Sequence, residues 1–248
     1  MSNQISQVWA VVPAAGSGSR MNGECPKQYL TLGSQTMLEV TLETLLNYPG
    51  FTGVVVAINS GDQTWEKLAV SNHPKVHCVT GGQSRAESVS NALHYLSALE
   101  DYADDKIGMW ACVHDAARPC VSVEKIDALV QYCLANGKGA ILGTPMADTV
   151  KRVGADAANQ ELHYIERTEK REQLWLAHTP QMFMLNELKA ALDYCQLDSL
   201  SVTDEASAIE NVGGRSDIVA DRKDNIKVTV PEDLAMAEFI LKNRRDLV

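Results

Sequence analysis

Short apolar runs recur along the chain at the length of a buried strand. The first, Val8–Pro13, is continuously apolar and ends in small residues, which is typical of a strand buried on both faces of a parallel sheet. Similar runs predict further strands at Val54–Ile58, Val76–Thr80, Met109–His114 and Ala140–Pro145. Stretches of helical character lie between them, at Met37–Asn47, Arg85–Leu99 and Val123–Asn136. Alternating strands and helices favour right-handed βαβ crossovers, so we expect a Rossmann-like, three-layer α/β sandwich with a mostly parallel sheet.

Residues 147–168 break this rhythm. Thr149–Val153 alternates in character, Gly154–Gln160 is rich in turn-forming residues, and Glu161–Arg167 can return as a second strand. The pattern predicts a protruding β-hairpin. An isolated two-stranded hairpin is marginally stable in water, so we expect this arm to pack on a second copy of the chain in a homodimer. The alternative is a flap that closes over a site in the same subunit.

The rest of the sequence indicates a single domain. The 248 residues lie within the ordinary size of one α/β domain, and no internal repeat or low-complexity tract is visible. The chain ends in a predicted helix from Pro231 to about Arg244, whose first turn places Glu232 and Asp233 at the positive helix end. We therefore expect one domain over residues 1–248, with 147–168 as its dimerisation arm.

The charge and cysteine content exclude several classes of protein. A formal net charge of -10 argues against broad contact with nucleic acid or an anionic membrane, so any phosphate ligand must meet a local basic cluster. The longest apolar runs have strand length and the first dozen residues lack a signal-peptide pattern, so we expect no membrane segment and a cytoplasmic protein. The 6 cysteines are scattered without a C-x-x-C pair, which predicts free, mostly buried thiols.

A glycine-rich loop follows the first predicted strand, at the place where open α/β sheets bind ligands. The loop contains Gly16, Gly18 and Arg20, and Lys27 follows shortly after it. Small residues let backbone N–H groups approach phosphate oxygens, and the two cationic side chains add positive charge, so the loop predicts a polyanion site. A dinucleotide fingerprint needs glycine where Met21 stands, and a P-loop needs a G-K-[ST] string that the chain lacks.

A series of short motifs runs through nearly the whole chain. The loop string Ala14-Ala15-Gly16-x-Gly18-x-Arg20-Met21 precedes Pro26-Lys27-Gln28-Tyr29-Leu30. Later motifs are Gly81-Gly82-x-x-Arg85-x-x-Ser88-Val89, His114-Asp115-Ala116-Ala117-Arg118-Pro119, Thr179-Pro180-Gln181, Thr203-Asp204-Glu205-Ala206 and Asp224-Asn225-Ile226-Lys227-Val228-Thr229. In this order the motifs resemble the signature of the 2-C-methyl-D-erythritol 4-phosphate cytidylyltransferases of the non-mevalonate isoprenoid pathway.

The resemblance implies a nucleotidyltransferase sandwich that joins CTP and 2-C-methyl-D-erythritol 4-phosphate, giving 4-diphosphocytidyl-2-C-methyl-D-erythritol and pyrophosphate. It also implies magnesium and a homodimer. In the family, residues matching Arg20 and Lys27 stabilise the transition state, and residues matching Arg171 and Lys227 position the acceptor phosphate. The resemblance assigns the acceptor pocket to Asp115, Arg118, Thr149, Thr179 and Thr203. It assigns cytidine binding to Ala14, Ala15, Gly82 and Ser88, with Gly16 in the same substrate-binding loop.

The implied reaction suits cationic side chains. The acceptor is a phosphate monoester that is largely dianionic at neutral pH and therefore already nucleophilic, so no general base is required. The obstacle is the repulsion between this dianion and a triphosphate, which positioning and charge neutralisation overcome. We expect Mg²⁺ to be held mainly by the CTP phosphates, with Asp115 as a candidate either to bind it or to accept hydroxyl groups. His114 is expected to be buried and hydrogen-bonded rather than catalytic.

Two features depart from the family pattern, and other functions remain open. His178 stands where family members often carry glutamine, and the stretch Glu166–Gln173 contains three basic residues. Arg167 is therefore a rival of Arg171 for the acceptor phosphate. A cytidylyltransferase for a pentitol phosphate such as ribitol 5-phosphate would keep the loop and change the acceptor pocket. The sequence separates the two acceptors only weakly, because an extra methyl group changes binding in a pocket by only about 1–3 kcal/mol. A non-catalytic nucleotide-binding module and an NAD-dependent oxidoreductase are further alternatives. Arg20 and Lys27 count against the module, and Met21 counts against the oxidoreductase.

Overall fold

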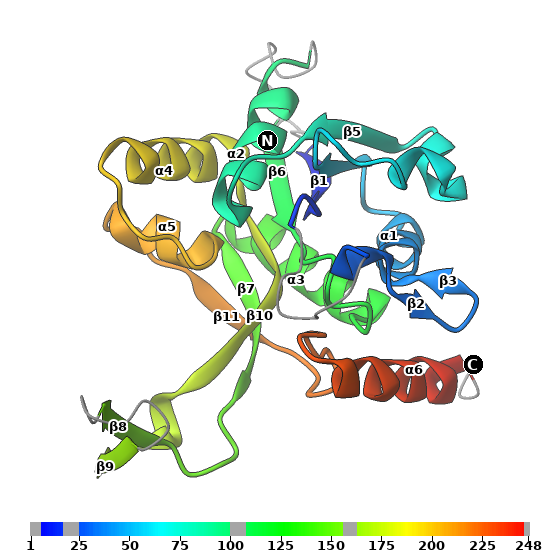
Figure 1. The fold of residues 1–248 in the computed structure, drawn as a ribbon. Helices are drawn as coiled ribbons and strands as arrows, with labels where there is room; N and C mark the ends of the chain where they lie inside the picture. Colours follow the sequence, from blue (N-terminus) through cyan, green and yellow to red (C-terminus); the bar gives the residue numbers. More distant parts are fainter. Residues whose placement is uncertain (1–5, 17–24, 100–107, 156–162, 246–248) are drawn as a thin grey trace.

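A seven-stranded sheet forms the centre of the computed structural model, which describes residues 6–16, 25–99, 108–155 and 163–245 (Figure 1). The strand order is β11-β7-β10-β6-β1-β4-β5. The strands are β1 (Ser6–Pro13), β4 (Gly53–Ile58), β5 (Val76–Thr80), β6 (Gly108–Val113), β7 (Ala140–Pro145), β10 (Trp175–Met184) and β11 (Asp217–Ala220). Every strand expected from the apolar runs is confirmed, with bounds that differ from the prediction by at most a residue or two.

The sheet is parallel except around β10, which runs antiparallel to both of its neighbours, β6 and β7. In the parallel part, Val11 of β1 pairs with Val55 of β4 and with Val113 of β6. All three side chains are buried, as expected where helices cover both faces of a parallel sheet. The mostly parallel sheet is therefore confirmed. β10 was not predicted, because polar residues interrupt its apolar pattern in the middle of the strand.

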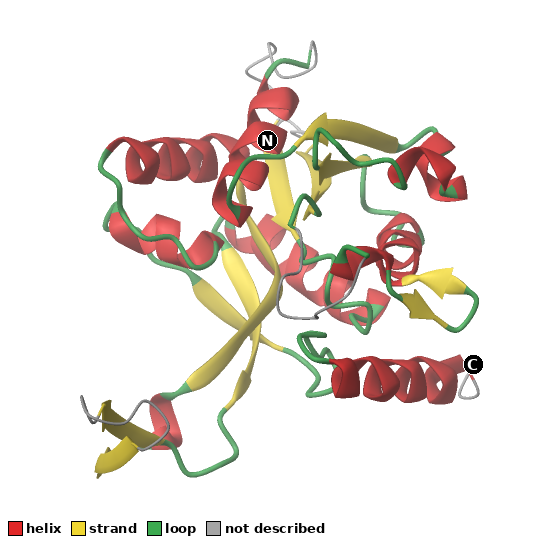
Figure 2. Cartoon of the chain, viewed as in Figure 1, coloured by secondary structure: helices red, strands yellow, loops and turns green. Residues whose placement is uncertain are grey.

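Helices cover both faces of this sheet, which confirms the three-layer sandwich (Figure 2). They are α1 (Met37–Leu46), α2 (Arg85–Ser97), α3 (Val123–Asn136), α4 (Leu185–Leu197) and α5 (Glu205–Asn211). Leu42 of α1 and Ile126 of α3 belong to the apolar core on one face of the sheet. Leu93 of α2 and Leu188 of α4 belong to the core on the other face. The sequence predicted α1, α2 and α3, whereas α4 and α5 were found only in the structure.

The helix that follows β5 begins at a fixed point because its first turn is capped. The Ser84 hydroxyl accepts a hydrogen bond from the Glu87 N–H at 3.1 Å, and the Glu87 carboxylate accepts one from the Ser84 N–H at 3.3 Å. This capping box satisfies backbone donors that a helix start leaves unpaired. It sets α2 to begin at Arg85, directly beside the Gly81–Gly82 turn.

The predicted arm is a β-hairpin. β8 (Lys151–Ala155) and β9 (His163–Thr168) pair antiparallel and project away from the sandwich, beyond the ends of β7 and β10 (Figure 1). Val153 and Ile165 are paired across the hairpin, and their relative exposures are 49% and 61%. The hairpin is thus confirmed outside residues 156–162, which lie beyond the described part. Dimerisation through this arm stays a prediction.

The predicted C-terminal helix is also confirmed, as α6 (Pro231–Arg245). It packs beside the small hairpin of β2 (Thr31–Leu32) and β3 (Gln35–Thr36), and Ala237 shares a buried cluster with Leu32 and Val228. The Asp233 carboxylate accepts hydrogen bonds from the N–H groups of Thr229 and Val230. These contacts hold the segment that carries Lys227 against the body of the protein.

Two predictions from composition can be compared with the structure. All six cysteines are free, and the four of them at Cys112, Cys120, Cys133 and Cys195 are buried, as expected for unpaired thiols. Within the described ranges, none of the helices combines the length and the apolar character that crossing a bilayer requires.

Candidate functional site

Three adjoining cavities lie where the loops after β1, β5 and β6 meet. The first, which we call the loop cavity, has a volume of about 390 Å³ and lies between the glycine loop and the start of α2. Its walls include four of the residues assigned to substrate binding, which are Ala15, Gly16, Gly82 and Ser88. The Gly82 N–H donates to the Ser88 hydroxyl at 3.1 Å. A Cβ atom on Gly81 would lie 2.4 Å from the Ala15 Cβ, so only glycine permits this close approach of the two loops.

The second space, the central cavity, has a volume of about 270 Å³ and collects basic side chains. Its walls include Ala14, Gly16, Lys27, Asp115 and Lys227, together with Arg85. The Lys27 ammonium group donates to the carbonyl oxygen of Val228 at 2.8 Å. The structure therefore brings Lys27 next to the segment of Lys227, although the two residues are separated by two hundred positions in sequence. Arg20, the other cation predicted for this loop, lies outside the described residues.

Short contacts anchor the segment that carries Lys27. The Gln28 amide donates to the carbonyl oxygen of Ala14 at 2.8 Å, and the Tyr29 hydroxyl donates to Asp62 at 2.7 Å. Gln28 and Tyr29 are both buried. The position of the Lys27 backbone is thus fixed against the end of β1, and its side chain extends into the central cavity.

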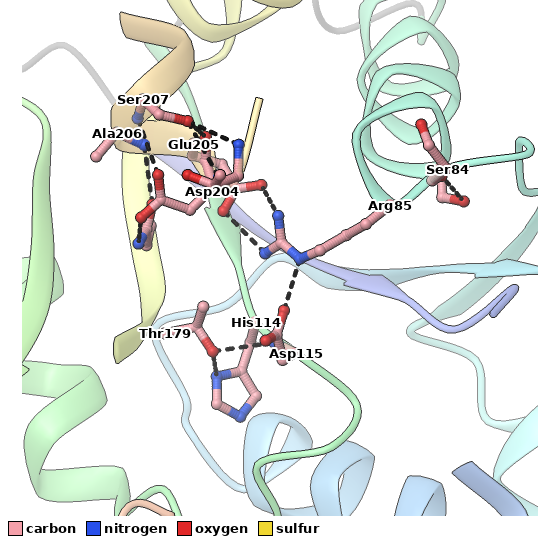
Figure 3. A network of polar contacts seen from close by, with 12 residues as sticks. Ser84, Arg85, His114, Asp115, Thr179, Asp204, Glu205, Ala206 and Ser207 are labelled. Atoms are coloured by element: carbon pink, nitrogen blue, oxygen red, sulfur yellow. Dashed lines mark hydrogen bonds and ion pairs between the residues drawn. The ribbon is translucent and has the colours of Figure 1, made fainter. Parts of the chain in front are cut away.

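The third space, the β10 cavity, has a volume of about 160 Å³ and lies beside the middle of β10. Its walls contain four of the five residues that the family resemblance assigned to the acceptor pocket, which are Asp115, Arg118, Thr179 and Thr203. The Thr179 hydroxyl contacts His114 Nδ1 at 3.0 Å and accepts from the Asp115 N–H at 3.0 Å (Figure 3). β10 therefore holds the loop after β6 in place, and that loop supplies both Asp115 and Arg118.

Asp115 lies at the centre of a charge network. Arg85 Nε donates to one carboxylate oxygen of Asp115 at 2.7 Å, and Lys227 Nζ donates to the other at 2.7 Å. Burial opposes the charged form of Asp115, but the two adjacent cations outweigh it and hold the pKa of this carboxyl well below its usual range. Asp115 is therefore a carboxylate at any physiological pH, and it fixes the position of the Lys227 ammonium group.

Sequence reasoning assigned no role to the residues that complete this network. The Arg85 guanidinium group also donates two hydrogen bonds to Glu205, at 2.7 and 3.0 Å, and Glu205 is 1% exposed (Figure 3). Arg85 lines all three cavities. Both residues belong to motifs that the sequence displays, and this was the one signal available for them. Their partnership joins segments that lie far apart in the chain.

His114 and Arg118 are both buried. His114 is hydrogen-bonded at both ring nitrogens, to Thr179 and to the carbonyl oxygen of Arg118, and burial lowers its pKa to about 4. The prediction that His114 is a buried, hydrogen-bonded residue is confirmed. Arg118 does not pair with Asp115. Its guanidinium group instead donates to the carbonyl oxygens of Asn225 at 2.6 Å and Ala177 at 3.4 Å.

Three residues predicted for the acceptor lie elsewhere in this chain. Thr149 and Arg171 are exposed at the base of the arm, where Arg171 donates to the carbonyl oxygen of Ala147. Arg167 lies in β9 and pairs with Glu169 at 3.1 Å. None of the three lines the loop, central or β10 cavity among the described residues. One chain by itself therefore does not bring the arm residues to the cavities.

The donor set of the site limits how it could hold a metal ion. In the described part of the chain, no three His, Cys, Asp or Glu residues gather as a metal site. Both oxygens of Asp115, the candidate metal ligand, accept hydrogen bonds from cations. Most of the ligands of a divalent ion at this position would have to come from a bound phosphate and from water.

Comparison with known proteins gives a consistent result over the full chain. The family model "IspD: 2-C-methyl-D-erythritol 4-phosphate cytidylyltransferase" matches residues 8–243. The cytidylyltransferase of that name from Vibrio vulnificus (strain CMCP6) is 45% identical over 246 residues, which cover 99% of each chain. Its counterpart from Vibrio atlanticus (strain LGP32) is 46% identical over 99% of this chain and 100% of the relative.

Solved structures agree with the sequence comparison. The crystal structure of the Francisella tularensis 2-C-methyl-D-erythritol 4-phosphate cytidylyltransferase is 34% identical, with a TM-score of 0.78 over 94% of this chain and 99% of the other. The enzyme from Thermus thermophilus is 27% identical, with a TM-score of 0.74 over 95% of this chain and 99% of the other. The resemblance seen in the motifs is confirmed, and the chain belongs to the 2-C-methyl-D-erythritol 4-phosphate cytidylyltransferase family.

Proposed function

We propose that this chain transfers CMP from CTP to 2-C-methyl-D-erythritol 4-phosphate, giving 4-diphosphocytidyl-2-C-methyl-D-erythritol and pyrophosphate. The observation that carries the proposal is the way the cavities adjoin. Arg85 lines all three, and Asp115 and Lys227 line both the central cavity and the β10 cavity. A nucleotide in the loop cavity and a phosphorylated acceptor in the β10 cavity would meet in the central cavity, between Lys27 and Lys227.

The loop cavity suits the cytidine end of CTP. Ala15, Gly16 and Gly82 contribute backbone rather than long side chains to its walls, so N–H and C=O groups are available to a base edge or a ribose. Ala14 lines the central cavity at the point where the loop turns toward Lys27. The triphosphate then extends toward Lys27, and we propose that Arg20 approaches it from the same loop.

The reaction requires charge neutralisation more than proton transfer. A phosphate oxygen of the acceptor attacks the α-phosphorus of CTP, the bond from that phosphorus to the bridging oxygen breaks, and pyrophosphate leaves with its electron pair. Lys27 and Arg20 stabilise the charge that develops on the triphosphate, and Lys227 positions the acceptor phosphate. His114 takes no part in proton transfer, because both ring nitrogens are hydrogen-bonded and its pKa of about 4 keeps it neutral.

We propose Mg²⁺ as the cofactor and the CTP phosphates as its main ligands. Mg²⁺ prefers oxygen ligands and commonly binds through one or two carboxylates together with substrate phosphates. Asp115 lines the central cavity and is the carboxylate that we assign to any contact between protein and ion. When bound, the ion withdraws charge from phosphate oxygens. The chain's own part is to keep Asp115 ionised, through Arg85 and Lys227.

We propose further that the arm of a second copy completes the site. Val153, Tyr164 and Ile165 expose 49%, 59% and 61% of their surface on the arm, which is a large apolar area for a free hairpin. Arg171 and Thr149 at the base of the arm would then reach the acceptor of the partner subunit. Arg171 is favoured over Arg167, because Glu169 offsets the charge of Arg167. The contact of Arg171 with the carbonyl oxygen of Ala147 does not neutralise its charge.

Mixing two variants with impaired acceptor binding tests this arrangement, with the acceptor kept well below its KM. Under that condition Arg171→Ala and Lys227→Ala each lower the rate of a homodimer strongly, yet half of the dimers formed after mixing equal amounts carry one variant of each kind. In such a mixed dimer, one of the two sites combines an intact body from one subunit with an intact arm from the other. Since half of the dimers are mixed and half of their sites are intact, mixing should restore about one quarter of the wild-type rate. If mixing restores no activity, or if the protein sediments as a monomer at micromolar concentration, the arm is better described as a flap that closes over the site of its own subunit.

We also propose that residues 1–248 form one nucleotidyltransferase domain that works in the cytoplasm. The single seven-stranded sheet joins strands from both ends of the chain, and the free thiols suit a reducing compartment. One cooperative unfolding transition is expected in denaturant. Two separated transitions would argue for independent domains.

The direct test of the function measures pyrophosphate release from CTP and Mg²⁺ with one of two acceptors. Release that depends on 2-C-methyl-D-erythritol 4-phosphate and is strongly reduced in Lys27→Ala supports the proposal. Release that depends on ribitol 5-phosphate would keep the mechanism and change the acceptor. Absence of release with either acceptor would favour a non-catalytic nucleotide-binding module.

A further inference from the structure

We infer that His178 binds the acceptor directly and accepts a hydrogen bond from one of its hydroxyl groups; this rests on the proposed function. His178 lies in β10 immediately before Thr179, and it lines the β10 cavity together with Asp115 and Arg118. Its side chain is 9% exposed. Because the imidazole ring is nearly buried in the wall of a polar cavity, only a small part of the ring can contact a ligand bound there.

Asp221 fixes the orientation of this ring. His178 Nδ1 lies 2.7 Å from one oxygen of Asp221, whose side chain is 1% exposed. The Asn225 amide donates to the same oxygen at 2.7 Å and to the carbonyl oxygen of Thr179 at 2.9 Å, which ties the pair to β10. A carboxylate oxygen can only accept hydrogen bonds, so Nδ1 carries a proton. In the neutral ring the other nitrogen, Nε2, is then an acceptor.

Nε2 is available to a ligand. No group within the described ranges is hydrogen-bonded to it, and it is not among the fully buried side-chain atoms that lack a partner. An unpaired ring nitrogen that is not fully enclosed must reach the accessible surface. Since His178 lines the β10 cavity, we assign that surface to the cavity.

The neighbouring side chains explain why a hydroxyl group is the expected partner. Arg85, Arg118 and Lys227 give the cavity many hydrogen-bond donors, which suit a phosphate. The carboxylates are less available, because Asp115 accepts from two cations and Asp204 accepts from Gln181 and from the N–H of Ser207. A polyol must also donate its hydroxyl protons, and His178 Nε2 supplies an acceptor for one of them.

Two substitutions separate the contact with the acceptor from the contact with Asp221. The amide nitrogen of asparagine occupies nearly the place of Nδ1, so His178→Asn keeps the bond to Asp221 and removes the group that faces the cavity. The longer glutamine in His178→Gln brings an amide oxygen to about the place of Nε2. The loss of one hydrogen bond in His178→Asn should raise the KM for the acceptor about fivefold. His178→Gln should stay within about twofold of wild type.

The KM for CTP provides the control. A binding role for His178 leaves the KM for CTP and the thermal midpoint nearly unchanged in His178→Asn. If both KM values rise alike while the thermal midpoint falls, or if the KM for the acceptor does not change, the inference is wrong. In the second case wild-type turnover of 2-C-methyl-D-erythritol 4-phosphate would still uphold the proposed function.

A spectroscopic measurement decides the contact without turnover. In ¹⁵N-histidine-labelled protein saturated with CTP and free of divalent metal, adding 2-C-methyl-D-erythritol 4-phosphate should shift the Nε2 resonance of His178. CTP alone should leave that resonance in place. A resonance that does not respond to saturating acceptor would overturn the inference, whether or not the protein proves to be the proposed enzyme.

Discussion

Arg85→Met should cost this protein a large part of its stability, because Arg85 pairs with two carboxylates inside the fold. Its guanidinium group contacts Glu205 at 2.7 and 3.0 Å and Asp115 at 2.7 Å, and the two acidic side chains are 1% and 10% exposed. Methionine keeps the unbranched stem but removes the charge. Glu205 then loses its cation, and Asp115 keeps only Lys227.

The magnitude follows from burial. Removing one partner of a buried ion pair costs about 3–5 kcal/mol, because the remaining charge stays desolvated. The Arg85 side chain is 27% exposed, so water can reach part of the vacated site, and the expected loss is about 3 kcal/mol, at the lower end of that range. The double variant Arg85→Met/Glu205→Leu should recover part of this loss, because it no longer buries the unpaired Glu205 carboxylate.

Equilibrium unfolding in urea at neutral pH measures the effect, with the free energy of unfolding taken from linear extrapolation. Lys189→Met is the matched control. Lys189 pairs with Asp193 at 2.9 Å with side chains 27% and 35% exposed, so its loss should cost less than about 1 kcal/mol. Equal losses for Arg85→Met and Lys189→Met, or a double variant less stable than Arg85→Met, would refute the reasoning.

Three further predictions concern single residues. Lys27→Ala should lower kcat by on the order of 10²–10³ with a smaller change in CTP affinity, and steady-state kinetics with an unaltered kcat would defeat this role. Arg171→Ala should raise the KM for the acceptor while Arg167→Ala leaves it near wild type; the reverse pattern would move the role to Arg167. His114 has its pKa lowered to about 4 by burial, so the stability that its neutral ring contributes is complete above the unfolded value of about 6.5 and falls as the pH drops toward 4. A pKa near 6.5 for His114 in an NMR titration of the folded protein would contradict this prediction.

The sequence by itself determined the parallel part of the sheet, and it predicted a candidate site beside the loop after the first strand. Runs such as Val54–Ile58 are apolar at every position, and this pattern is typical of a strand that is covered on both faces. The capped start of α2 at Ser84 and the glycine that ends α3 at Gly137 are local signals as well, because caps act within one turn of a helix. The order of the motifs also identified the family, because that order can be read from the sequence without knowing the fold.

Only the tertiary structure decided which of these local pieces meet. β10 enters the sheet antiparallel between β6 and β7, and its Thr179 holds the loop of Asp115. Arg85 and Glu205 are 120 positions apart, and Lys227 and Asp115 are 112 apart. The amino-acid sequence contains no local pattern that predicts such pairs, because their contact depends on the order of the strands in the sheet. Their energetic importance depends on burial, which makes the loss of one partner costly. The same holds for Arg171, which the fold leaves at the base of the arm, outside the walls of the central and β10 cavities of its own subunit.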